Sequence, residues 1–156
     1  MDKKSLRQLF VLFLVMKDLG CEADLIRTND LWDKAKGAWI SYMCLSSSRT
    51  QLNILQAIRS LPECSEAKGE FLTADGFFSI DIALTRADGT KVAIEVDGPT
   101  HFMSNNHTRI NGSTALRNRL LEARGWRVVS VSVEAWSRVP QGGEKQFLLD
   151  LLEAVP

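Results

Sequence analysis

The spacing of hydrophobic and polar residues changes its period along the chain, and this change divides the chain into two parts. Up to residue 61 the apolar positions recur every three or four residues, as on one face of a helix. This spacing predicts helices over 5–19, 30–43 and 48–61. From residue 77 onward, short apolar runs and alternation predict strands over 77–85, 91–96 and 126–133. Helices are predicted over 114–124 and 144–154, and the polar residues 103–113 predict a loop.

The organisation that follows is an α/β fold preceded by a helical segment. Residues 1–45 are predicted to be the helical N-terminal segment, and residues 46–156 the α/β domain. Ser46, Ser47 and Ser48 separate the two parts and provide candidate N-caps for the helix that follows. A surface on the N-terminal helices that binds a protein partner is a further hypothesis for the first part.

The apolar run 9–16 is too short to cross a membrane. It has eight residues, whereas a spanning helix needs about twenty. We therefore expect a buried helix and no membrane partner. No Arg- and Ser-rich, acid-poor targeting segment is visible in this chain.

Composition adds little about function. The formal net charge is zero, so the chain as a whole carries no charge signal for nucleic acid. The three cysteines, Cys21, Cys44 and Cys64, are spaced too widely for a zinc knuckle, and we expect reduced thiols.

The connection between the first two predicted strands decides where the acidic residues lie. A two-residue loop would place apolar and acidic residues on the same face, which the alternation forbids. A three-residue loop over 87–89, with Gly89 in the left-handed conformation, removes this conflict. Asp81 then lies across from Glu95, and Ser79 across from Asp97. The sequence therefore predicts an acidic cluster of Asp81, Glu95 and Asp97 on one face of the sheet.

This acidic cluster has three explanations. It could bind a hard divalent cation such as Mg²⁺ or Mn²⁺, because these ions prefer carboxylate oxygens. It could contain a carboxyl group with a raised pKa, because close carboxylates resist double ionisation. It could also be neutralised by arginines from the following helix. Glu70 could join the cluster, but we expect a solvated surface glutamate.

Basic residues concentrate after the acidic strand. Five arginines are candidate contacts to phosphate groups: Arg109, Arg117, Arg119, Arg124 and Arg127. The alternative is an ordinary solvated helix surface. Arg117 and Arg124 are predicted to share one helix face, with Leu116, Leu120 and Ala123 toward the sheet.

Two tryptophans and a histidine are the remaining candidates near these groups. Trp126 and Trp136 could stack on exposed bases, although core packing is the favoured interpretation. His101 could carry a proton or bind a metal, and the alternative is a role in stabilising the turn.

The acidic strand and the turn after it resemble a known family. Residues 93–102 read Ala-Ile-Glu-Val-Asp-Gly-Pro-Thr-His-Phe, which looks like the signature of RAP domains. The resemblance covers roughly residues 46–153. The further matching segments are Ser48–Leu61, Ser79–Ile82, Gly112, Thr114, Leu116, Arg119–Leu121, Gly125–Trp126, Glu134–Trp136, Glu144–Lys145 and Leu148–Leu152.

The resemblance implies a fold and a setting. RAP domains are regarded as RNA-binding modules at the C-terminal end of helical-repeat or FAST kinase-type proteins that act on mitochondrial or chloroplast RNA. Their fold is similar to that of restriction-endonuclease-like proteins, a mixed sheet flanked by helices. In such nucleases two acids hold a divalent metal, and the matching positions here are Asp81 and Glu95. The lysine expected two residues later is replaced by Asp97, which leaves its role in activating water unfilled.

Two functional hypotheses follow from the resemblance. The first is an RNA-binding domain for organellar RNA processing or ribosomal RNA maturation, with single-stranded RNA as its partner and a helical-repeat region or another protein beside it. The second is a metal-dependent endoribonuclease, in which Asp81, Glu95 and Asp97 hold the metal and His101 carries a proton. We favour binding, because the lysine is missing and a family fold does not establish an activity.

Overall fold

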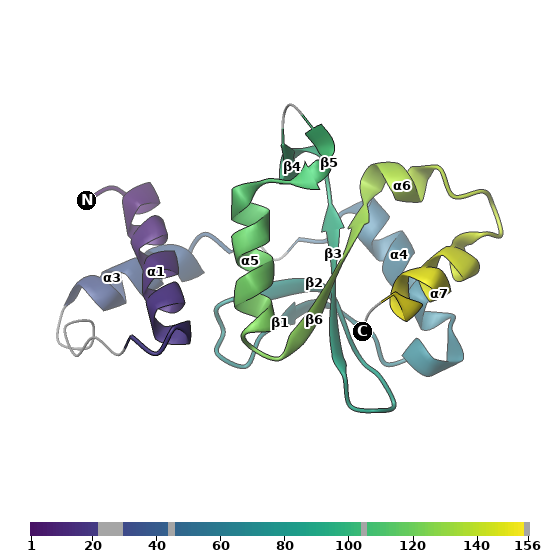
Figure 1. The fold of residues 1–156 in the computed structure, drawn as a ribbon, viewed down its shortest axis with the longest axis horizontal. Helices are drawn as coiled ribbons and strands as arrows, with labels where there is room; N and C mark the ends of the chain where they lie inside the picture. Colours follow the sequence, from purple (N-terminus) through teal and green to yellow (C-terminus); the bar gives the residue numbers. More distant parts are fainter. Residues whose placement is uncertain (22–29, 44–45, 104–105, 155–156) are drawn as a thin grey trace.

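The computed structural model describes residues 1–21, 30–43, 46–103 and 106–154. Their centre is a mixed four-stranded sheet in the order β1-β2-β3-β6 (Figure 1). The strands are β1 (Lys68–Leu72), β2 (Ser79–Thr85), β3 (Lys91–Asp97) and β6 (Trp126–Ser132). The first three are antiparallel, and β6 runs parallel to β3. The predicted mixed sheet flanked by helices, with an N-terminal helical segment, is confirmed.

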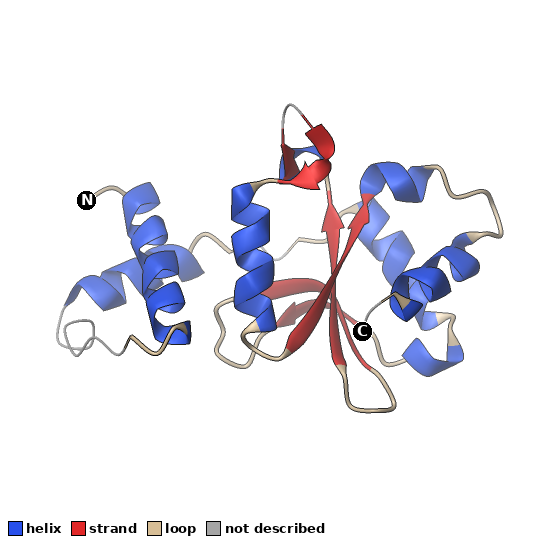
Figure 2. Ribbon diagram, in the orientation of Figure 1, coloured by secondary structure: helices blue, strands red, loops and turns tan. Residues whose placement is uncertain are grey.

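Helices cover both faces of the sheet (Figure 2). One face packs against α4 (Arg49–Arg59) and α7 (Glu144–Glu153), and Ile54, Ile58 and Leu148 are fully buried there. The other face packs against α5 (Gly112–Glu122), which lies between the sheet and the N-terminal helices. The sheet is therefore the middle layer, and polar groups on its strands are enclosed.

The N-terminal helices are α1 (Lys3–Asp18) and α3 (Asp30–Ile40). Phe10 of α1 is fully buried, and its ring lies 5.2 Å from Trp32, 5.8 Å from Trp39 and 5.0 Å from Phe77. These aromatic contacts join both helices to the segment that leads into β2. No helix in the described parts of the chain is long and apolar enough to span a bilayer.

Helix α4 begins where the serine run predicts. Ser48 is its N-cap, and the Ser48 hydroxyl accepts a hydrogen bond from the backbone N–H of Gln51 at 3.1 Å. The Gln51 side chain accepts one from the Ser48 backbone, which completes a capping box. The chain turns after α4 into the short 3₁₀ helix η1 (Pro62–Cys64).

The loop between β2 and β3 has the predicted three residues. Arg86 and Thr90 close it with a backbone hydrogen bond of 2.9 Å, and Gly89 has φ +84°. Ile82 pairs with Ile94, so the predicted register is confirmed for the part of the hairpin next to the loop. This register brings the acidic residues of β2 and β3 to the same end of the hairpin.

The alternation predicts one apolar face along the whole of β2. In the structure the apolar side chains change from one face of the sheet to the other. Ile82 and Leu84 pack on the α4 side, whereas Phe78 and Ile80 pack on the α5 side. The change occurs beside Glu70 of β1, whose φ of +48° lies in the left-handed region. A residue in this conformation bends the ladder locally, and no sequence period signals it.

Three other elements differ from the sequence prediction. β1 was not predicted, because Gly69 and Glu70 are poor strand formers. The predicted loop 103–113 is wrong in part, since β4 (Phe102–Met103) and β5 (Asn106–Ile110) form an antiparallel pair. The short helix α6 (Val133–Ser137) follows β6.

Candidate functional site

The polar end of β3 is built where β2 separates from it. The ladder between these two described strands ends at Ile82 and Ile94, one residue before Asp81 would face Glu95. The Asp81 carboxylate instead accepts a hydrogen bond from the backbone N–H of Val96 at 2.8 Å. Burial raises the pKa of Asp81, with the Val96 hydrogen bond and Arg117 acting against it. Asp81 therefore replaces a backbone acceptor of the ladder and lies beside the acids of β3.

The predicted pairing of Ser79 with Asp97 is wrong. At this point β2 pairs with β1 alone, where Ser79 lies opposite Leu72. The Ser79 hydroxyl donates a hydrogen bond to Glu70 at 3.0 Å. The ladder between β2 and β3 has already ended at this point, so Ser79 does not pair with Asp97.

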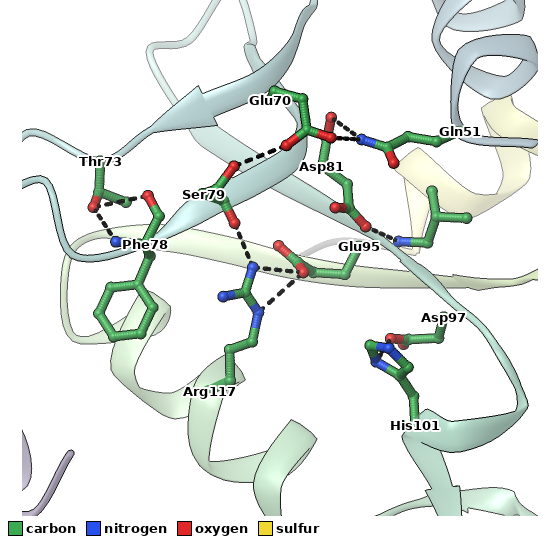
Figure 3. Close-up of polar contacts among 11 residues, drawn as sticks. Gln51, Glu70, Thr73, Phe78, Ser79, Asp81, Glu95, Asp97, His101 and Arg117 are labelled. Atoms are coloured by element: carbon green, nitrogen blue, oxygen red, sulfur yellow. Dashed lines mark hydrogen bonds and ion pairs between the residues drawn. The ribbon is translucent and has the colours of Figure 1, made fainter. Parts of the chain in front are cut away.

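Glu95 is held by an arginine from α5 (Figure 3). The Arg117 Nε and Nη2 atoms lie 3.1 Å and 2.9 Å from Glu95 Oε2, and Nη2 also donates to the backbone carbonyl of Ser79. Glu95 is only 4% exposed. Burial raises its pKa to about 7, against the opposing effect of Arg117 and with a further increase from Asp81 and Asp97. Two of the three explanations for the cluster, a raised pKa and an arginine partner, thus apply to one residue.

Asp97 is paired with His101, which follows it in the 3₁₀ helix η2 (Pro99–His101). The His101 Nδ1 atom lies 2.7 Å from Asp97 Oδ1. The Asp97 side chain is buried, whereas the His101 side chain is 43% exposed. The histidine ring therefore connects a buried carboxylate to the surface.

Glu70 is not the solvated glutamate that we expected from the sequence. One of its carboxylate oxygens accepts hydrogen bonds from Ser47 Oγ at 3.1 Å and Gln51 Nε2 at 2.8 Å, and the other bonds to Ser79 (Figure 3). Gln51 Nε2 also donates to the backbone carbonyl of Asp81. This network ties α4 and β1 to the acidic end of the sheet. The sequence reasoning missed it, because the partners are far apart in the chain and only tertiary packing joins them.

Two oxygen atoms of the acidic group have no protein partner. Within the described residues, Glu95 Oε1 and Asp97 Oδ2 are buried and accept no hydrogen bond. Such atoms are the kind of ligand that a hard divalent cation prefers. Yet nowhere in the described residues do three or more His, Cys, Asp or Glu side chains form a group that could hold a metal. The acidic group thus offers a cation two unpartnered oxygens, and the three-acid metal set stays a prediction.

The five candidate arginines do not form one surface. Arg117 and Arg124 lie together over the Phe78 ring, as their shared helix face predicts. Arg124 is engaged with Asp75 at 2.6 Å and Asp18 at 3.3 Å, so it joins the domain to α1. The expectation that Ala123 faces the sheet is wrong, because Ala123 is exposed.

The other three arginines are exposed but lie on different elements. Arg109 is on β5, Arg119 is on α5 and Arg127 is near the start of β6. Arg127 pairs with Val92, at the opposite end of β3 from Asp97. Arg109 and Arg119, in contrast, belong to the hairpin and the helix that follow η2.

Both tryptophans pack against core residues, as the favoured interpretation predicts, although Trp126 is buried and Trp136 is only half-buried. The Trp126 ring lies 5.5 Å from that of Phe71, and the Trp136 ring 5.8 Å from that of Phe147. Trp126 is therefore too buried to stack on a base, whereas part of the Trp136 side chain is accessible.

Comparison with known proteins finds a family match for the part of the chain that contains Glu95, Asp97 and His101. Residues 94–150 match the model of the RAP domain. A chloroplastic RAP domain-containing protein of Oryza sativa subsp. japonica is 39% identical over 67 residues, which are 43% of this chain and 10% of that relative. The chain thus aligns with about a tenth of the length of this relative. Over residues 94–150, the chain is thus similar to the RAP domain family.

Proposed function

We propose that this chain is an RNA-binding domain that acts in organellar RNA processing or ribosomal RNA maturation. The RAP domain match carries the proposal, since similarity to this family supports an RNA-related role. The matched segment contains the Asp97–His101 pair, the β4–β5 hairpin and α5. His101, Arg109 and Arg119, which are accessible, therefore lie in the matched part that follows β3.

The exposed arginines on this segment are the groups that would contact phosphate. Arg109 and Arg119 are exposed, and arginine matches the geometry of a phosphate group. Arg117 and Arg124 already bind carboxylates inside the fold. Of the five arginines predicted from the sequence, we therefore assign phosphate contacts to Arg109 and Arg119 first.

Salt dependence tests this assignment. Binding of the whole chain to a labelled single-stranded RNA should weaken as salt rises, because phosphate contacts release counterions. Arg109→Ala and Arg119→Ala should each lower the slope of log affinity against log salt by about one. Arg138→Ala is the matched control, because Arg138 is exposed and already paired with Glu134. RNA binding that ignores salt, or equal effects of all three substitutions, would contradict the proposal.

The two unpartnered oxygens favour a second candidate, a metal-dependent endoribonuclease. Glu95 Oε1 and Asp97 Oδ2 would hold a Mg²⁺ or Mn²⁺ ion, with Asp81 beside them. Such an ion supplies Lewis-acid activation of water. His101, exposed and bonded to Asp97, is the residue that could move a proton at this site.

Cleavage assays separate the two candidates. RNA would be incubated with the chain in the presence of Mn²⁺ or of a chelator. Cleavage that needs the metal and disappears in both Asp81→Ala and Glu95→Ala, while RNA binding persists, would establish the nuclease. Intact RNA under both conditions, with binding retained, would support the binding role alone.

The cellular setting is part of the proposal. The name of the rice relative places that protein in the chloroplast. For this chain we propose an organelle, either mitochondrion or chloroplast, and a helical-repeat region or a protein partner beside the domain. A fluorescent fusion of the full natural protein, observed in cells with an organelle marker, tests the location.

A further inference from the structure

His101 is fixed at the surface by contacts to both its ring and its backbone. The ring bonds to Asp97 at 2.7 Å. The His101 carbonyl accepts hydrogen bonds from the Asn111 N–H at 2.9 Å and from Thr114 Oγ1 at 3.3 Å. Asn111 also donates from its side-chain amide to the carbonyl of Thr100 at 2.7 Å. The turn is thereby clamped to the start of α5, and the exposed edge of the imidazole has a defined position.

The contact with Asp97 decides which ring nitrogen carries hydrogen. A carboxylate oxygen can only accept a hydrogen bond, so the His101 Nδ1 atom must be the donor. In the neutral ring the other nitrogen, Nε2, then has a free lone pair and acts as an acceptor. The buried Asp97 therefore presents a hydrogen-bond acceptor at the surface through His101.

An acceptor in this place selects among the groups of a nucleic acid. Phosphate oxygens are acceptors and cannot bond to a lone pair on nitrogen. In the sugar–phosphate backbone the hydrogen-bond donor is the ribose 2′-hydroxyl, which DNA lacks. The exposed Arg109 lies two residues before Asn111, at the end of the hairpin that leads from η2. A cation for phosphate and an acceptor for the sugar thus come from adjacent segments.

We propose that His101 Nε2 accepts a hydrogen bond from a 2′-hydroxyl of bound RNA, so that the Asp97–His101 pair distinguishes RNA from DNA. This inference rests on the proposed RNA-binding function and adds the group that recognises the ribose. His101 is the residue that contacts RNA, and Asp97 acts through it by setting its tautomer. Figure 3 shows the ring of His101 beside the Asp97 carboxylate, away from Arg117.

The test compares three ligands of one base sequence: RNA, DNA and RNA with 2′-O-methyl groups. The methylated RNA keeps the ribose oxygen but has no donor. The whole chain should bind RNA about three- to tenfold more tightly than either other ligand, the size expected for one hydrogen bond. His101→Phe, which keeps an aromatic ring without nitrogen atoms, should remove this preference. Arg138→Ala, a substitution of an exposed residue on another element, should retain it.

The outcomes distinguish this inference from the function on which it rests. If the chain binds RNA but His101→Phe leaves the RNA preference unchanged, the 2′-hydroxyl contact is refuted and the RNA-binding function stands. Equal binding of methylated and unmodified RNA by the natural chain refutes the contact in the same way. If the chain binds no RNA, the proposed function itself fails.

Nuclear magnetic resonance gives a test that needs no RNA. Long-range ¹H–¹⁵N correlations of the imidazole, recorded at mildly alkaline pH, identify the nitrogen that carries hydrogen. We expect the Nδ1–H form for His101. The Nε2–H form would overturn the inference, because the exposed nitrogen would then be a donor. Thermal unfolding of His101→Phe checks that this variant is folded.

Discussion

Glu95→Gln should change how the stability of the fold depends on pH. Burial raises the pKa of Glu95 to about 7 in the folded chain, from an ordinary value of 4.5. Between these values the folded chain keeps a proton that the unfolded chain releases. The stabilisation is therefore complete below the unfolded pKa, and it is lost as the pH rises through the folded pKa.

The size of the effect follows from the shift. One pKa unit corresponds to about 1.4 kcal/mol, so the shift of Glu95 corresponds to about 3 kcal/mol between about pH 4 and pH 8. A glutamine keeps the shape and can still accept the hydrogen bond from Arg117, but it does not ionise. Over this pH range the free energy of unfolding of the natural chain should therefore fall by about 3 kcal/mol more than that of Glu95→Gln.

Urea unfolding at several pH values measures this difference. Other groups that titrate, including Asp81, are present in both proteins, so their contributions largely cancel in the comparison. Glu153→Gln is the matched control, because Glu153 is exposed at the end of α7. Its curve should run parallel to that of the natural chain. If Glu95→Gln also runs parallel to the natural chain, the argument from burial is refuted.

Three further substitutions test the packing and the caps. Ile54→Ala should lower the free energy of unfolding by about 2–5 kcal/mol, because Ile54 is fully buried between α4 and the sheet; a loss below about 1 kcal/mol in chemical denaturation would contradict this packing. Ser48→Ala should lower the free energy of unfolding by about 1 kcal/mol, since it removes the N-cap of α4. Ser137 is exposed and caps no helix, so Ser137→Ala should lower it less when both variants are compared by thermal unfolding. Asn111→Ala should also cost about 1 kcal/mol by removing the N-cap of α5. It should weaken RNA binding as well, because it removes the hydrogen bond from the Asn111 side-chain amide to the Thr100 carbonyl, which holds the turn that carries His101; unaltered binding in an anisotropy titration would show that this side-chain contact is not needed.

The parts of the fold that sequence reasoning predicted are those fixed by local chemistry. The hairpin between β2 and β3 follows from alternation and from a glycine at the one loop position with a positive φ. The start of α4 follows from the serine run, in which Ser48 is the N-cap. Both signals lie within a few residues of the feature that they specify.

The parts that it missed depend on distant partners. The Glu70 side chain accepts hydrogen bonds from Ser47, which precedes α4, from Gln51 of α4 and from Ser79 of β2. The sequence left Arg117 open between a phosphate contact and neutralisation of the acidic cluster, because nothing near it in the chain marks Glu95 as its partner. For charged residues on a helix, the choice between solvent, ligand and internal partner is made by tertiary packing.

The candidate site was located by its residue types, but its internal contacts were not. The spacing of Glu95 and Asp97 places both side chains on one face of β3, and both are almost completely buried. The sequence could not show that one acid binds Arg117 while the other binds His101. The difference matters, because it divides the predicted cluster into an internal ion pair and a pair that reaches the surface.

This division also bears on the residue that replaces the expected nuclease lysine. Placing a carboxylate with an unpartnered oxygen in a buried position costs stability, and apolar residues would fill the same space without that cost. A strand with a purely structural role does not need such a buried carboxylate. Asp97 nevertheless occupies this position, and the polar contact that its side chain makes among the described residues orients a histidine that is exposed. Buried polar groups that break the local rule are expected at functional sites. The substitution is therefore better explained by what Asp97 does to His101 than as the simple loss of a catalytic lysine.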